Sequence, residues 1–74
     1  MNIRQIIGEN VRCFRYKMNW SQEALGSHTG LHHDYLGRLE RGQVNISVEN
    51  LVKIASVLEV APHFLLIEGR CYED

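Results

Sequence analysis

The chain has 74 residues, of which 45% are hydrophobic and 23% charged, and its formal net charge is −1. This composition is far from that of a disordered chain, and the net charge argues weakly against a uniformly basic nucleic-acid coat protein. It predicts one domain over residues 1–74, with a core at about residues 3–68 and a frayed tail at 69–74. Nothing resembles a signal peptide or a membrane span, so we expect a cytoplasmic protein. Two cysteines are too few for a disulfide framework, and we expect free thiols.

Apolar periodicity predicts five helices and no strand, which makes the fold class all-α. The expected helices cover residues 3–18, 22–28, 32–41, 48–59 and a short segment that begins at Pro62. One face of the first helix would bury Ile3, Ile7, Val11, Phe14 and Met18. Ser21 and Ser47 are suited to capping the second and fourth helices, and proline is favoured in the first turn of a helix.

The second and third helices are separated by a short turn that contains Gly30. Two helices joined in this way form a helix-turn-helix, whose second helix enters the major groove of DNA by its N-terminal end. Leu36 and Leu39 would face the core. The outward positions at the start of this helix are polar or small, as groove entry requires, and comprise His32, His33, Asp34, Gly37 and Arg38.

Four segments carry a resemblance to a known family: IGENVRCFR, WSQEALGSHTGL, YLGRLERG and SVENLVKIASVLEVAPHFLL. Together they resemble the Cro and phage-repressor type of helix-turn-helix domain, the XRE family, over residues 7–67. The resemblance implies a compact, five-helix, lambda-repressor-like domain that binds DNA and regulates transcription. The loop GQVNIS, with a hydrophobic residue where the family commonly has proline, is more similar to the controller proteins of restriction–modification systems.

The resemblance also implies roles for individual residues. Base contacts are expected from His33, Asp34, Arg38 and Arg41. Contacts to the DNA backbone are expected from Ser21, Gln22, His32 and Asn45. Arg15 and Glu40 match a pair that ties the first helix to the third. The chemistry agrees, because arginine binds guanine O6 and N7 bidentately and a carboxylate accepts from cytosine N4.

Each of these roles has a simpler alternative. Asp34 near a helix start complements the helix dipole without touching a base. For Arg38 the alternative is a solvated surface position, and for Gln22 it is an ordinary place in a first turn; we favour DNA contact for both. His32 would then serve only as a helix cap, for which histidine is less suited than serine or aspartate.

A single domain of this kind makes few contacts, so we expect a homodimer on a pseudo-palindromic operator. Apolar residues left over after the core is filled place the dimer interface at Val57, Leu66 and Ile67. The competing class is an antitoxin-type or other protein-interaction module on the same fold. About five free residues in the tail are few for covering a protein partner, which disfavours that class.

The four histidines raise the question of a metal site. His28 is separated from His32 and His33 by the break at Gly30, and adjacent residues of a helix point in different directions. We therefore expect no metal, no cofactor and no small-molecule substrate. Protonation of His32 or His33 would strengthen phosphate contacts at low pH, although a helix N-terminus opposes that charge. No catalytic arrangement is visible, so we do not expect an enzyme.

Overall fold

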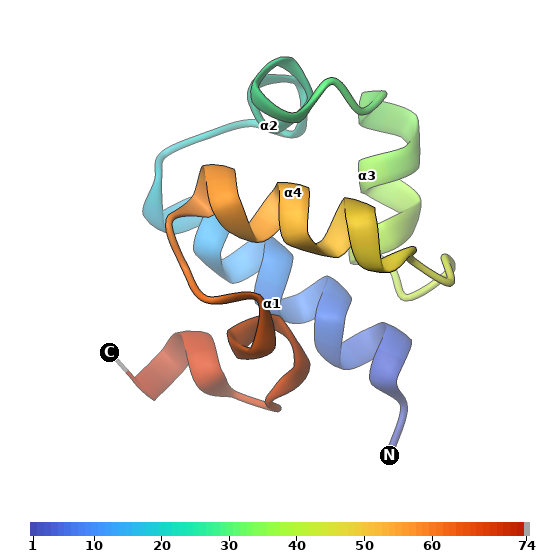
Figure 1. Cartoon of the computed structure of the whole chain (residues 1–74), viewed down its shortest axis with the longest axis vertical. Coiled ribbons are helices and arrows are strands. Elements are labelled where there is room, and N and C mark those ends of the chain that lie inside the picture. The colour runs from blue at the N-terminus through green and yellow to red at the C-terminus, as the bar shows by residue number, and fades with distance from the viewer. Residues whose placement is uncertain (74) are drawn as a thin grey trace.

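The computed structural model describes residues 1–73, and these form four α-helices and two short 3-10 helices. The elements are α1 (Ile3–Lys17), α2 (Gln22–Thr29), α3 (His33–Glu40), α4 (Val48–Leu58), η1 (Pro62–Leu66) and η2 (Arg70–Glu73). In Figure 1, α4 lies across α1. The helices α2 and α3 lie above them in the view, and the N-terminus and η2 lie below. The all-helical fold is confirmed. None of the helices described is long and apolar enough to cross a membrane.

The expected fifth α-helix is wrong, because the segment that begins at Pro62 forms the 3-10 helix η1. A buried side chain explains the difference. Asn10 in α1 donates from Nδ2 to the backbone carbonyls of Phe64, Leu65 and Ile67, at 3.3, 3.0 and 2.9 Å. Carbonyls that bond to a side chain on another helix do not need the hydrogen bonds of an α-helix. The segment is therefore bonded to α1 and forms a short 3-10 helix instead of an α-helix.

The core lies between α1 and the other elements. Its fully buried members are Val11, Leu25, Leu36, Leu39, Ile54, Ala55, Leu65 and Cys71. The prediction for α4 is confirmed, with Leu51, Ile54, Ala55 and Leu58 buried. In α1 the prediction is wrong at its first position, because Ile3 is 41% exposed and Ile6 is buried. Ile3 is the first residue of α1, and its side chain remains partly in solvent.

Both serine caps are confirmed. Ser21 Oγ accepts from the backbone N–H of Ala24 at 3.0 Å, and Ser47 Oγ accepts from that of Asn50 at 3.1 Å. Each bond satisfies one of the N–H groups that a helix leaves free at its first turn. The two caps thus fix where α2 and α4 begin, and so where the turn before each helix ends.

Two expectations are wrong: the two cysteines are not free thiols, and residues 69–73 do not form a frayed tail. Cys13 and Cys71 form a disulfide with Cα atoms 6.1 Å apart, and Cys71 is fully buried. The chain reverses at Gly69, whose φ of +75° suits glycine, and this turn lays η2 along α1. The structured domain therefore extends to Glu73 instead of ending near residue 68, and residue 74 lies outside the described part.

Candidate nucleic-acid interface

The turn between α2 and α3 is closed by Thr29 and Gly30. Thr29 Oγ1 donates to the Leu25 carbonyl at 2.8 Å and accepts from the Leu31 N–H at 3.2 Å. Gly30 has a φ of +77°, and its N–H donates to the Gly26 carbonyl at 2.7 Å. The left-handed conformation ends α2 sharply, as at many helix C-termini. Because the turn is bonded internally, it holds the two helices of a helix-turn-helix at a fixed angle.

The polar side chains predicted on α3 are exposed together at its solvent side. His32, His33, Asp34, Arg38 and Arg41 are all exposed, while Leu36 and Leu39 are buried. Gly37, which the sequence placed among the outward residues, is buried: a side chain there would lie 3.3 Å from Gln22 Oε1. Gly37 thus belongs to the contact between α2 and α3, and the exposed set is smaller by one residue.

The opposite side of α3 is held by a buried ion pair. Arg15 donates from Nε to Glu40 Oε2 at 2.7 Å and from Nη2 to Glu40 Oε1 at 2.8 Å. Its third nitrogen, Nη1, donates to the Trp20 carbonyl at 2.9 Å. The hydrogen bond to Glu40 raises the pKa of the Arg15 guanidinium above its ordinary value. A bidentate geometry fixes orientation as well as distance, so the predicted pair is confirmed as a tie between α1 and α3.

Gln22 also joins this network, since its Nε2 donates to Glu40 Oε1 at 3.1 Å. Sequence reasoning missed two further members. Arg12 Nη2 donates to the Glu40 backbone carbonyl at 3.1 Å. Gly8 approaches the end of α3 so closely that a Cβ there would lie 2.5 Å from the Leu39 carbonyl oxygen. Gly8 and Arg12 are four residues apart and so share one face of α1, which is the one sequence signal that could have linked them.

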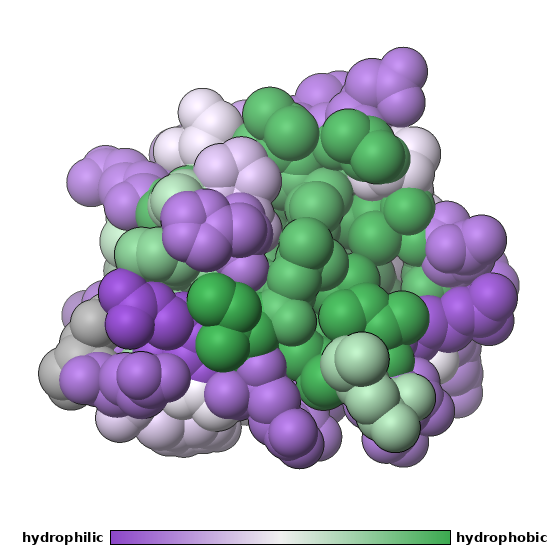
Figure 2. Space-filling view, turned by 60° about the horizontal axis from the view of Figure 1, so that its bottom comes forward, coloured by the Kyte–Doolittle hydropathy of each residue, from purple (hydrophilic) through white to green (hydrophobic). Residues whose placement is uncertain are grey.

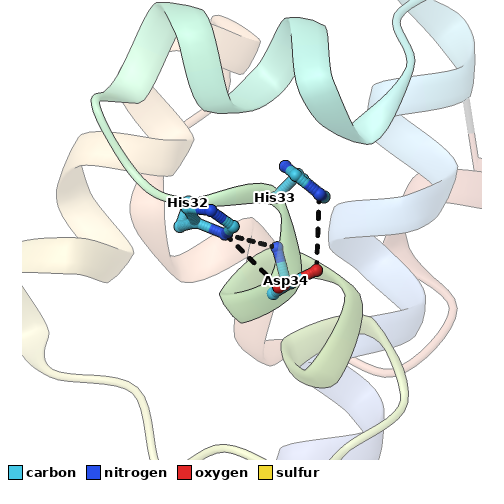
Figure 3. Close-up of side chains that lie close together, drawn as sticks. All are labelled: His32, His33 and Asp34. Carbon is cyan, nitrogen blue, oxygen red and sulfur yellow. Dashed lines mark hydrogen bonds and ion pairs between the residues drawn. The ribbon is translucent and has the colours of Figure 1, made fainter.

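The two adjacent histidines do not diverge as expected. Their rings stack, with centroids 4.5 Å apart and planes 25° from parallel. The reason is that His32 is the N-cap of α3, with an extended φ of −69° and ψ of 142°, so helical spacing does not apply to it. His32 Nδ1 accepts from the Asp34 N–H at 3.1 Å, which confirms a capping role. Figure 3 shows both rings beside the Asp34 carboxylate at the start of the helix.

These three side chains also form the one group in residues 1–73 whose donor atoms are close enough to share a metal ion. His33 Nε2 lies 3.3 Å from Asp34 Oδ1, and His32 Nδ1 lies 3.7 Å from Asp34 Oδ2. His28 stands apart from them and stacks on Trp20, with ring centroids 4.2 Å apart. The expectation that His28 lies apart from His32 and His33 is therefore confirmed.

The residues expected at a dimer interface are Val57 on α4, Leu66 at the end of η1 and Ile67 directly after it. Leu66 and Ile67 are 41% and 42% exposed, whereas Val57 is partly buried against the core. An open hollow on α4 adds apolar surface and is lined by Val48, Glu49, Val52, Lys53, Ser56 and Val57. Figure 2 shows hydrophobic side chains gathered over a broad face of the molecule. The remaining predicted contact residue, Asn45, is exposed in the loop before α4.

The paired helices, their bonded turn and the exposed polar start of α3 define a helix-turn-helix protein. The family model described as "Helix-turn-helix" matches residues 12–65, and the chain belongs to that family. It is 44% identical over 66 residues to the control protein C.BamHI of Bacillus amyloliquefaciens, covering 88% of this chain and 82% of that one.

Two solved structures extend the likeness to three dimensions. The restriction–modification controller protein C.AhdI of Aeromonas hydrophila is 37% identical, with a TM-score of 0.80 over 84% of this chain and 94% of that one. The c2 repressor of Salmonella phage P22, solved with a synthetic operator, is 32% identical. Its TM-score is 0.77, over 81% of this chain and 91% of that one.

Proposed function

We propose that this chain is a transcriptional regulator that binds a pseudo-palindromic operator as a homodimer and controls a restriction–modification system. The observation that carries the proposal is the two-sided character of α3. One side is locked to α1 and α2 through Glu40, and the other presents polar side chains to solvent. Likeness to controller proteins and to an operator-bound repressor supports the same function. A regulator that acts on a chromosomal operator would work in the cytoplasm, and we include that location in the proposal.

Sequence reading is assigned to His33, Asp34, Arg38 and Arg41. Arginine discriminates guanine through two parallel hydrogen bonds, and a carboxylate accepts from cytosine N4. His33 and Asp34 lie in the first turn of α3 and Arg38 one turn further, so together they span the part of a recognition helix that enters the groove. Arg41 follows the helix and is free to reach a base or a phosphate.

Positioning on the duplex is assigned to Ser21, Gln22, His32 and Asn45. Ser21 and Gln22 stand at the start of α2, where N–H groups and the positive helix end attract phosphate. The Gln22 amide has two N–H donors, so the bond to Glu40 leaves it a second donor for DNA. This arrangement would link phosphate binding to the buried pair that orients α3.

The dimer is assigned to the apolar face of α4 and η1, with Val57, Leu66 and Ile67 at its centre. Exposed aliphatic side chains of this size are removed from water when two copies pair about a two-fold axis. An antitoxin-type module is less favoured, because the tail residues that would be free to hold a protein partner are packed on α1 as η2.

Selection of bound duplexes from a randomised pool tests the function. We expect an inverted repeat with one half-site for each protomer. Arg38→Ala should relax the preference at one base pair per half-site, with a loss of about 1–3 kcal/mol against the selected sequence. Arg4→Ala removes the same charge from the exposed first turn of α1 and serves as the control. Recovery of no sequence motif, or an unchanged preference in Arg38→Ala, would refute the proposal.

The dimer is tested by sedimentation of the free protein over a range of concentrations. Leu66→Ala and Ile67→Ala together should raise the dissociation constant of the dimer, while Val44→Ala, on the partly buried loop before α4, should leave it unchanged. A double variant that still forms dimers as the parent chain does would exclude this face.

A further inference from the structure

We propose that His32, His33 and Asp34 bind Zn²⁺ or a similar divalent transition-metal ion, and that the bound ion withdraws these side chains from DNA. The second half of this inference rests on the proposed function, because it assumes that the same side chains contact the operator. The first half rests on geometry alone and is tested without DNA.

The donor set has the right chemistry for such an ion. Imidazole nitrogen suits zinc, copper and nickel, and a carboxylate oxygen completes a mixed site that magnesium and calcium would not prefer. One donor atom from each of the three residues lies within 4.8 Å of the others. In a tetrahedral zinc site the ligand atoms stand about 3.4 Å apart, given bonds of about 2.1 Å. Small side-chain rotations are therefore enough to close the triad, with water in the remaining position.

The cap of α3 explains why the donors converge. Because His32 is extended and its ring folds back over the helix end, it stacks on His33 instead of pointing away from it. Figure 3 shows the two rings and the carboxylate at the same end of the helix. Metal binding at His32 Nδ1 would replace the hydrogen bond from the Asp34 N–H. That N–H is exposed, so water takes over the bond at little cost.

Charges around the triad act in both directions. The N-terminal end of α3 and Arg38, one turn further along, oppose a cation. The Asp34 carboxylate is itself a ligand. Glu23 of α2 lines the same open hollow as His32 and His33, together with Ser27. Glu23 thus adds a negative charge to the hollow that His32 and His33 line, although it is not one of the three ligands.

The chain offers this ion little competition elsewhere. Both cysteines are joined in the disulfide, so the described residues have no thiolate to bind zinc. His28 is stacked on Trp20, and His63 is placed on η1, away from the helix-turn-helix. A single zinc ion per chain should thus find one preferred site.

Occupancy would change DNA binding because two of the three ligands, His33 and Asp34, are proposed base-reading residues and the third, His32, is a proposed backbone contact. Coordination uses one ring nitrogen of each imidazole and one carboxylate oxygen of Asp34, and it would hold the Asp34 side chain at the metal instead of leaving it to turn toward cytosine N4. Zinc should therefore weaken binding to the selected operator, and a chelator should restore it.

The test begins with calorimetric titration of the oxidised protein with zinc chloride in a non-coordinating buffer. We expect one ion per chain, with magnesium chloride giving no heat of binding. Asp34→Asn and His33→Ala should each weaken zinc binding by about 10–100-fold, at least as much as the loss of an outer-shell partner elsewhere. His32→Asn keeps a good N-cap while removing the imidazole, so its loss of zinc binding would not reflect unfolding. His63→Ala is the matched control.

Zinc binding that survives in all three cluster variants, or that is lost in His63→Ala, would overturn the site. The operator is then titrated with and without zinc by fluorescence anisotropy. A fall in affinity in the parent chain, absent in His32→Asn, supports antagonism, and an equal or higher affinity with zinc overturns it. If the metal-free protein selects no operator, the proposed function fails, but the calorimetric result for the metal site still stands or falls by itself.

Discussion

Reduction of the Cys13–Cys71 disulfide should lower the free energy of unfolding by about 4 kcal/mol. The two cysteines are 58 residues apart, and a cross-link over a loop of that length restricts the unfolded chain to about this extent. Domains of this size lose roughly 4–8 °C of melting temperature per kcal/mol. The reduced protein should therefore melt roughly 15–30 °C below the oxidised one.

The assay is thermal unfolding followed by far-ultraviolet circular dichroism, with and without a phosphine reductant. Reduction of the parent chain is the cleanest perturbation, because both sulfur atoms remain in the core. Alkylation and mass measurement confirm two thiols per chain in the reduced sample. The Cys13→Ser, Cys71→Ser double variant should show no response to the reductant. A fully reduced parent chain that melts within about 5 °C of the oxidised form would refute the loop-entropy argument.

Three further changes test the contacts of α1 by urea denaturation. Glu40→Gln leaves the Arg15 guanidinium buried without its counter-charge and should destabilise by about 3–5 kcal/mol. The ion pair raises the pKa of Arg15. The contribution of the pair to the free energy of unfolding is therefore complete below the ordinary arginine pKa, and it is lost only as pH rises through the raised pKa. The difference between Glu40→Gln and the parent should thus be flat between about pH 7 and 10, and a fall there would contradict the assignment. Gly8→Ala places a methyl group against the Leu39 carbonyl and should lower the free energy of unfolding by about 1–3 kcal/mol. An unchanged free energy of unfolding would mean that α1 and α3 can move apart freely. Asn10→Ala removes the side-chain donor from three backbone carbonyls and should lower the free energy of unfolding by about 1–3 kcal/mol. The dimer should weaken as well. An unaffected dimer would show that Asn10 stabilises the fold without supporting the dimer interface.

The local parts of this fold could be predicted from the sequence. Ser21 and Ser47 act within three residues of their own position, and the periodicity of α4 identifies its buried face. Such features depend on helix geometry alone, which the sequence carries directly.

The parts that escaped prediction depend on residues far apart in the chain. The form of η1 depends on Asn10, more than 50 residues away, and the disulfide joins equally distant positions. The stacking of His32 on His33 could not be predicted for another reason. It depends on where α3 begins, and a shift of one residue in a helix boundary changes the direction of a side chain completely. Arg15 and Glu40 could be paired only because the family resemblance supplied a contact between helices.

One helix, α1, holds both of the surfaces that the proposed function requires. Its Gly8 and Arg15 fix the reading helix, and its Asn10 and Cys13 fix the C-terminal segment that carries Leu66 and Ile67. In the proposed dimer, the distance between the two reading helices is therefore set by α1, not by a flexible linker. The spacer between half-sites becomes a property of the fold, as strictly selected as the bases themselves. Operators whose half-sites are correct but separated by one extra base pair should be rejected, because both proposed surfaces are held on one continuous helix that would not absorb the added rise and twist.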